Sequence, residues 1–158
     1  MSGYIHILDD IGFFAPMILF TFSIILLWSR IKYLNVYLIF FLLNMLLNKT
    51  LKQLIGEPRP GEATEKNVYK GYENTGGAEI YGMPSGHAQS VIFSTIYTYL
   101  VTKTESVLIG GGFISMLSLV QRYRFKRHSI KQLIIGSLIG AGVAVFGYNI
   151  STFYLTCK

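Results

Sequence analysis

IGFFAPMILFTFSIILLWS, at residues 11–29, runs for 19 residues without a charged side chain. Four further uncharged runs follow it, at 33–48, 80–102, 106–121 and 132–157. A helix that spans a bilayer needs about 20 mainly apolar residues, which the first, third and fifth runs supply unaided. The other two are shorter, but flanking Lys and Arg side chains can reach the headgroups. The sequence therefore predicts an all-α integral membrane bundle of about five transmembrane helices.

The helices are expected at about 11–28, 33–55, 85–102, 106–122 and 130–154, in a single transmembrane domain that covers residues 1–158. Pro58 and Pro60 should end the second helix, because proline cannot continue the hydrogen-bond ladder. Residues 57–83 then form a polar loop that is too long for a plain connector. Its acidic residues are Glu57, Glu62, Glu65, Glu73 and Glu79. A solvated loop explains them better than a divalent-ion site does.

Composition narrows the function classes. The runs at 13–28 and 37–47 lack the apolar stripe of an amphipathic helix, which argues against a soluble helical protein. The net charge of +6 comes from cations at helix ends, so lipid headgroups or a substrate phosphate are better partners than nucleic acid. Asp9 and Asp10 stand where a cleaved signal peptide would be basic, and Cys157 alone excludes an internal disulfide.

Three polar stretches carry the candidate chemistry: Lys52-x6-Arg59-Pro60, Pro84-Ser85-Gly86-His87 and Arg122-x5-His128. With five spans, the loop 57–83 and the connection 121–131 lie on the same side of the membrane. All three stretches should therefore meet there, although Lys52 and His128 are 76 residues apart. Lys52 also shares a helix face with Asn44 and Asn48, and such a face must point into the bundle.

Each stretch has a simpler explanation when it is taken alone. Lys52 could extend to the headgroups from a helix end, and Pro-Ser-Gly could be an ordinary helix cap. Most cations near residue 128 could anchor the chain to anionic lipid. The combination favours an anion site, because a guanidinium fork and the free amides of a helix start at Ser85 and Gly86 suit phosphate oxygens. An imidazole such as His87 has no role in a cap.

The order and spacing of these stretches resemble the signature of the type 2 phosphatidic acid phosphatase superfamily. The resemblance covers about residues 44–136 and implies a role for each matching residue. His128 would be the nucleophile that forms a phosphohistidine, and His87 would protonate the leaving oxygen. The phosphate oxygens would be held by Lys52, Arg59, Ser85, Gly86 and Arg122. No cofactor and no metal ion are implied, and no cluster at metal-ligand spacing is present in the sequence.

The chain departs from the family pattern at residue 132. Many members carry Asp four residues after the nucleophilic histidine, and this chain has Gln132. A glutamine carbonyl can still accept the Nδ1 hydrogen of His128 from one helical turn away, but it brings no charge. Gln132 and Gly136 resemble both the dolichyl-diphosphatase and the glucose-6-phosphatase branches, and the stretch 81–89 resembles the dolichyl-diphosphatase form. Gln121 stands where the family usually has Ser, and the usual first of six spans is not apparent.

The resemblance implies a lipid phosphatase, with a polyprenyl diphosphate as the preferred lipid phosphate substrate. Two alternatives remain open: a catalytically weak lipid-phosphate-binding or membrane-assembly protein of the same fold, and a small transporter or channel. The active-site face holds ten Lys and Arg against four on the other, which favours the cytoplasm. The resemblance implies a lumenal or extracytoplasmic face instead. Gly136, Gly140 and Ala144 are expected to pack helices within the chain, with a homo-oligomer as the alternative.

Overall fold

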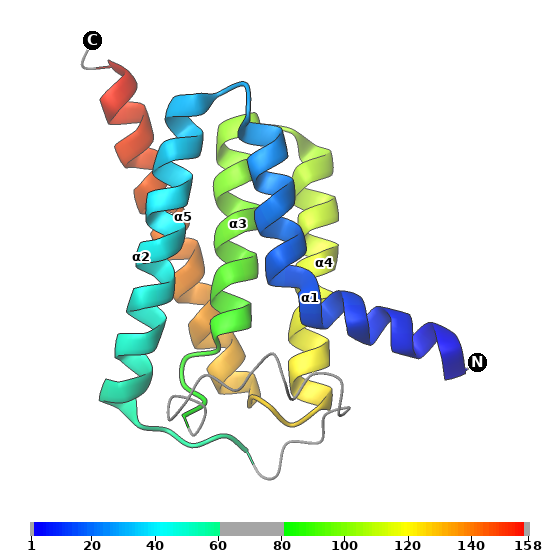
Figure 1. Ribbon diagram of the computed structural model, residues 1–158. Helices are drawn as coiled ribbons and strands as arrows, with labels where there is room; N and C mark the ends of the chain where they lie inside the picture. Colours follow the sequence, from blue (N-terminus) through cyan, green and yellow to red (C-terminus); the bar gives the residue numbers. More distant parts are fainter. Residues whose placement is uncertain (1, 61–80, 157–158) are drawn as a thin grey trace.

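The computed structural model describes the backbone of residues 2–60 and 81–156, and the side chains of 7–60 and 81–154. Five helices make up this part of the chain (Figure 1). They are α1 (Ser2–Leu27), α2 (Ile31–Ile55), α3 (Gly86–Thr102), α4 (Glu105–Arg124) and α5 (Ile130–Thr156). The predicted all-α fold with five helices is confirmed. The four glutamates predicted in the loop beyond Glu57 lie outside the described residues.

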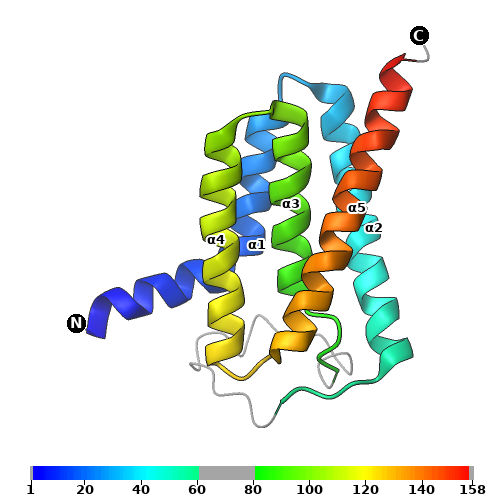
Figure 2. The same cartoon turned by 180° about the vertical axis from the view of Figure 1, so that it is seen from behind.

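Helix α3 lies at the centre of the bundle and contacts each of the other four helices (Figures 1 and 2). Its polar side chains are therefore surrounded by protein and find partners there. Hydroxyl pairs join Thr98 to Ser23 of α1 at 2.8 Å, Thr95 to Ser115 of α4 at 3.1 Å, and Tyr97 to Ser151 of α5 at 2.7 Å. These bonds explain how a helix rich in Ser and Thr can sit inside an otherwise apolar bundle.

Within the part of the chain that the structure describes, three stretches are long and apolar enough to cross a membrane, namely Ile7–Leu27, Ile31–Ile55 and Ile130–Tyr154. Helix α3 has 17 residues, and α4 is less apolar than the other helices. Both lie alongside the three longer helices, as a membrane-embedded bundle requires. The prediction of a helical membrane bundle therefore agrees with the structure.

The predicted start of the first helix was wrong, because α1 begins at Ser2 rather than near residue 11. The helix bends, and its first part projects sideways from the bundle instead of running along it (Figures 1 and 2). Pro16 lies inside the helix and cannot donate to the carbonyl of Gly12 four residues earlier. Asp9 is buried in this first part and pairs with Arg124 at 2.9 Å. The helix therefore includes an acidic residue, and an uncharged run could not be used to predict its start.

Helix α2 ends at Ile55, as expected, but the residue that ends it is Gly56. Gly56 has φ +63°, a left-handed conformation that glycine adopts without steric cost, and its N–H donates to the carbonyl of Lys52 at 3.1 Å. Pro58 and Pro60 follow this cap. The carbonyl of Glu57 accepts from the N–H of Gly82 at 2.7 Å, which joins the end of α2 to the segment before α3.

The small residues of α5 pack against α3, which confirms the expectation of packing within the chain. A Cβ atom at Gly136 would lie 2.5 Å from the carbonyl oxygen of Ser85. At Gly140 it would lie 2.2 Å from the carbonyl oxygen of Gln89. Only glycine permits the backbones of α5 and α3 to approach this closely, so α5 packs directly against the start of α3.

The three motif stretches meet at one end of the bundle, as the count of five helices predicted. The end of α2, the start of α3 and the connection between α4 and α5 all lie at the same end in Figures 1 and 2. Hydrogen bonds join them, since the N–H of Ser85 donates to the carbonyl of Gln132 at 3.1 Å. The candidate site is therefore assembled from three segments that are distant in sequence.

Candidate active site

His128 is placed by a tight turn at the end of α4. The carbonyl of Arg122 accepts from the N–H groups of Arg127 and His128, at 3.0 and 3.3 Å. Lys126 has φ +54° and reverses the chain direction within this turn. The five-residue spacer between Arg122 and His128 thus folds back on itself and brings both side chains beneath the bundle. Both are almost fully buried, with 1% and 3% of their surfaces exposed.

The imidazole of His128 makes two contacts through Nδ1. This nitrogen lies 2.9 Å from the carbonyl oxygen of Gly82 and 3.2 Å from Oε1 of Gln132. A carbonyl oxygen can only accept, so Nδ1 must be the nitrogen that carries the hydrogen. In the neutral ring, Nε2 therefore carries a lone pair.

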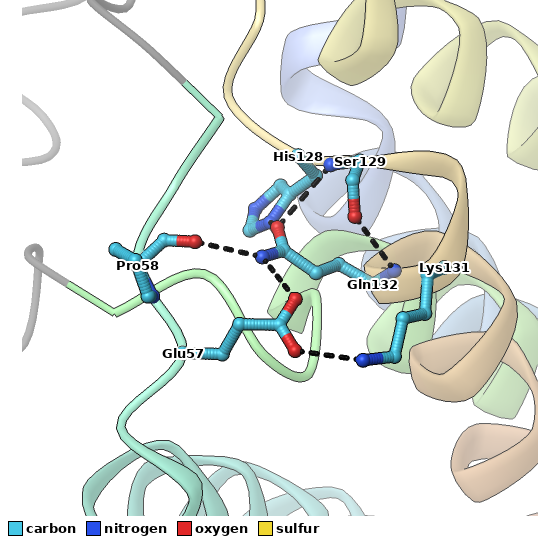
Figure 3. A network of polar contacts seen from close by, with 6 residues as sticks. All are labelled: Glu57, Pro58, His128, Ser129, Lys131 and Gln132. Atoms are coloured by element: carbon cyan, nitrogen blue, oxygen red, sulfur yellow. Dashed lines mark hydrogen bonds and ion pairs between the residues drawn. The ribbon is translucent and has the colours of Figure 1, made fainter.

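The orientation of the Gln132 amide is fixed by its other partners (Figure 3). Its Oε1 accepts from the N–H of Ser129 at 3.2 Å, and its Nε2 donates to the carbonyl of Pro58 and to Oε1 of Glu57, both at 3.0 Å. A reversed amide would place hydrogens against the Ser129 N–H and an oxygen against two acceptors. The contact that the sequence predicted between Gln132 and His128 is therefore present, and the amide presents its oxygen to the ring.

The surroundings of His128 keep its imidazole neutral. Burial lowers its pKa from 6.5 to about 3, and the positive charges of Arg59, Lys52 and Arg122 act in the same direction. The hydrogen bond with Gln132 opposes this shift. All three cations that the sequence predicted around a phosphate therefore act on the same ring. A neutral imidazole among three cations is suited to attack a phosphorus centre whose oxygens those cations would hold.

His87 lies on the other side of Arg122. Nη2 of Arg122 is 2.5 Å from Nε2 of His87, and its guanidinium stacks over the ring of Phe13 with the centroid 4.9 Å away. A guanidinium has only donors, so Nε2 of His87 accepts this bond. The same nitrogen is 3.2 Å from the carbonyl oxygen of Phe13. Arg122 thus connects the two histidines, since it touches one and lowers the pKa of the other.

The start of α3 is capped by Ser85, whose Oγ accepts from the N–H of Ala88 at 3.4 Å. The expectation that the Ser85 amide is available to an anion was wrong, because this N–H donates to Gln132. The amides of Gly86 and His87 remain as the helix-start donors, since the first amides of a helix have no partner within it. The hydroxyl hydrogen of Ser85 can also donate.

A polar network between α2 and α3 holds this helix start in place. Nε2 of Gln89 donates to Oδ1 of Asn44 at 2.8 Å, and Nδ2 of Asn48 donates to Oε1 of Gln89 at 2.8 Å and to the carbonyl of Pro84 at 3.2 Å. Asn44 is buried and Asn48 is half-buried. The predicted polar face of α2, which ends at Lys52, therefore does point into the bundle.

Two of the cations outside the motifs also have protein partners. Arg124 pairs with Asp9, and Nζ of Lys131 donates to Oε2 of Glu57 at 3.0 Å. Both cations remain substantially exposed, at 49% and 68% of their side-chain surfaces. The expectation that these residues serve mainly as lipid anchors is therefore incomplete, because each also ties a loop or helix to its neighbour.

Two cavities flank the histidines. A groove of about 500 Å³ between α1 and α2, with α3 as its floor, has His87 at its polar end. The groove is lined by Pro16, Met17, Phe20, Phe41, Met45, Asn48, Gly86, His87 and Ser90. A second cavity of about 780 Å³ lies beside His128 and is lined by Arg124, Lys126 and Lys131 among others. One histidine therefore borders a mainly apolar groove, and the other borders a basic cavity.

Comparison with known proteins identifies the family. The family model described as the PAP2 superfamily matches residues 32–154, which include all the predicted site residues. The chain belongs to the PAP2 superfamily. It is also 25% identical over 114 residues to lipid phosphate phosphatase epsilon 1, a chloroplastic protein of Arabidopsis thaliana. That match covers 67% of this chain and 36% of the relative. No solved structure matches the chain.

Several residues of this PAP2 site were not singled out by sequence reasoning. Glu57 was assigned to a solvated loop, yet its side chain bonds Gln132 and Lys131. Its position two residues before Arg59, inside the first motif stretch, was the available signal. Gly82 contributes only a carbonyl oxygen, which no side-chain pattern can reveal. Gln89 lies within the quoted stretch 81–89, but its bonds to α2 depend on how the two helices pack.

Proposed function

We propose that this chain carries the active site of a membrane lipid phosphatase that works through a phosphohistidine on His128. The observation that supports this most is the state of His128, which is a neutral ring with its lone pair on Nε2 among three cations. The proposed role of these cations is to hold the oxygens of the transferring phosphoryl group. Membership of the PAP2 superfamily and the named Arabidopsis relative agree with this class of reaction.

In the proposed first step, Nε2 of His128 forms a bond to phosphorus, and the bond from phosphorus to the leaving oxygen breaks. His87 gives that oxygen a proton. In the second step water attacks phosphorus, His87 takes a proton from the water, and the N–P bond breaks to release inorganic phosphate. Each group ends in its starting state, so the cycle needs no further reactant.

Phosphate binding would also prepare His87 for its role. In the structure Nε2 of His87 accepts from Arg122, and a nitrogen that accepts cannot at the same time donate to a leaving oxygen. A phosphate oxygen is a better acceptor for a guanidinium, because the bond is then charge-assisted on both sides. We therefore expect Arg122 to turn to the substrate, after which Nε2 of His87 can carry the proton.

The two cavities support the proposed placement of the leaving group and the phosphoryl group, and they support the class of substrate. The apolar groove next to His87 suits a long hydrocarbon leaving group, and the basic cavity next to His128 suits the phosphoryl group and the entering water. A polyprenyl diphosphate fits both, because its terminal phosphate can face His128 while the prenyl chain follows the groove. The resemblance of the stretch 81–89 to the dolichyl-diphosphatase form favours the same substrate class.

The test is phosphate release from a polyprenyl diphosphate, phosphatidate and glucose 6-phosphate, measured side by side. Purified protein should release phosphate fastest from the polyprenyl diphosphate. His128→Ala should lose about 10⁴-fold or more in rate, as loss of a nucleophile usually does. Equal phosphate release by wild type and His128→Ala would instead support a lipid-phosphate-binding protein without catalysis.

The side of the membrane is part of the proposal. We place the active-site end on the lumenal or extracytoplasmic face, following the family resemblance. In sealed vesicles of known orientation, the loop 57–83 should be cleaved by a protease added to the face that corresponds to the lumen or the outside. Cleavage from the cytoplasmic face alone would reverse the assignment and would agree with the distribution of Lys and Arg.

A further inference from the structure

We infer that Glu57 is a positioning residue for His128, which acts through Gln132 and supplies the negative charge that Gln132 itself lacks. This inference rests on the proposed phosphohistidine mechanism. It assigns a role to a residue that lies outside the motif positions and was expected to be solvated.

Three side chains, His128, Gln132 and Glu57, are joined in series by hydrogen bonds (Figure 3). His128 donates from Nδ1 to Oε1 of Gln132 at 3.2 Å, and Gln132 donates from Nε2 to Oε1 of Glu57 at 3.0 Å. The other oxygen of Glu57 accepts from Lys131 at 3.0 Å. The carboxylate is therefore one amide away from the imidazole, and the amide dipole points its oxygen at the ring.

Glu57 also resists reversal of the amide. If the Gln132 amide turned over, its oxygen would face both the Glu57 carboxylate and the Pro58 carbonyl, and its hydrogens would face Nδ1–H of His128. Pro58 can oppose this only as a neutral acceptor, whereas Glu57 opposes it with a full charge. Loss of the charge would therefore permit the orientation that leaves His128 without an acceptor on Gln132.

The carboxylate is charged when the enzyme would work. Hydrogen bonds from Gln132 and Lys131 hold the pKa of Glu57 below its ordinary value of 4.5. When Nε2 bonds to phosphorus, the ring becomes cationic and keeps its Nδ1 hydrogen, since an amide oxygen is too weak a base to remove it. A negative charge behind the amide would stabilise that cation, as a directly bonded carboxylate does in other enzymes.

The side chain can be changed without disturbing the local backbone. The bond from the Gly82 N–H to residue 57 uses the carbonyl oxygen, so any side chain at 57 keeps it. Glu57→Gln keeps the size and an acceptor but removes the charge. Glu105→Gln makes the same chemical change at an exposed glutamate, the first residue of α4, at the end of the bundle opposite the histidines (Figure 1), which makes it the matched control.

The decisive experiment exchanges the two residues. We would measure kcat, KM and the single-turnover rate of phosphoenzyme formation for Glu57→Gln, Gln132→Glu, the double variant with both changes, and Glu105→Gln. Glu57→Gln should lower kcat by about tenfold or more with little change in KM, because the lost bond is charge-assisted. Gln132→Glu should also be slow, since two carboxylates then face each other.

The double variant should recover activity well above either single variant. It places a carboxylate directly on His128 and an amide at 57 that can donate to that carboxylate, so residues 57 and 132 pair again. The Pro58 carbonyl loses the donor that Gln132 supplied, so we expect recovery to be partial. Glu105→Gln should stay within about threefold of wild type, as expected for an exposed substitution away from the site. Full activity of Glu57→Gln, or a double variant as slow as the product of the single effects, would overturn the inference. If His128→Ala also keeps full activity, the proposed function itself fails.

Discussion

Nδ1 of His128 is bound and its Nε2 carries the lone pair, and this assignment follows from hydrogen-bond partners that can only accept. The candidate site residues could be proposed from the sequence, because His87, His128 and the three cations occupy spaced motif positions. The tautomers and hydrogen-bond partners of these residues could not be predicted in the same way. The tautomer of His128 depends on the Gly82 carbonyl and on the amide orientation of Gln132, which Ser129, Pro58 and Glu57 fix together.

The lowered pKa of His128 has a consequence for acid stability. The folded protein keeps the ring neutral down to about pH 3, whereas the unfolded chain protonates it near pH 6.5. The unfolded state therefore binds more protons between these values, and the free energy of unfolding falls as the pH falls through this window. The contribution is about 1.4 kcal/mol per pH unit.

His128→Gln should remove this slope. Between pH 6 and pH 4, its free energy of unfolding should fall by about 2–3 kcal/mol less than that of the wild type. Denaturant titrations in zwitterionic detergent at each pH would measure the difference. Parallel curves for the two proteins would show that the His128 ring is protonated in the folded state or that burial does not lower its pKa.

At the scale of the helices, apolar run length predicted the number and order of the five elements and most of their ends. The start of α1 was missed because Asp9 is inside the helix and pairs with Arg124, 115 residues away. The role of Gly56 as the cap of α2 was missed in favour of the prolines beyond it. The small-residue spacing indicated that α5 packs within the chain, but it did not show that the partner is α3 or which backbone atoms the glycines approach.

Substitutions on α5 test that packing. A Cβ at Gly140 would lie 2.2 Å from a backbone oxygen of α3, whereas nothing lies within 4 Å of a Cβ at Gly142. Gly140→Ala should therefore lower the free energy of unfolding by about 1–3 kcal/mol through overpacking. Gly142→Ala should be neutral or slightly stabilising, because alanine favours a helix. Thermal unfolding in detergent compares them, and equal melting temperatures would contradict the close contact of α5 with α3.

At the scale of the whole molecule, the bundle places a polar end at one membrane surface and an apolar groove beside it. Helices α1 and α2 each pack on α3 and have little contact with one another, which leaves the groove between them. The sequence predicted the common end of the three motifs by counting spans. It gave no indication of the groove, because Met17, Phe20, Phe41 and Met45 look like ordinary lipid-facing residues in a helix.

A bulky side chain in the groove should affect lipid substrates alone. Met45 lines the groove, whereas the adjacent Leu46, which is exposed to a similar extent, does not. Met45→Trp should raise KM for a polyprenyl diphosphate by about tenfold, since apolar chain contacts are lost. It should leave the hydrolysis of a small soluble phosphate ester unchanged. Leu46→Trp is the matched control, and an equal effect of both variants on the lipid would argue against the groove as the chain site.

The covalent intermediate tests the central claim most directly. Wild-type protein would be mixed with substrate carrying ³²P in the transferred phosphate, quenched in base within one turnover, and digested for mass spectrometry. For a phosphohistidine on His128 we expect a label that is stable to base, labile to acid, located on His128, and absent from His128→Ala. A label on another residue, or phosphate release by His128→Ala at the wild-type rate, would contradict it.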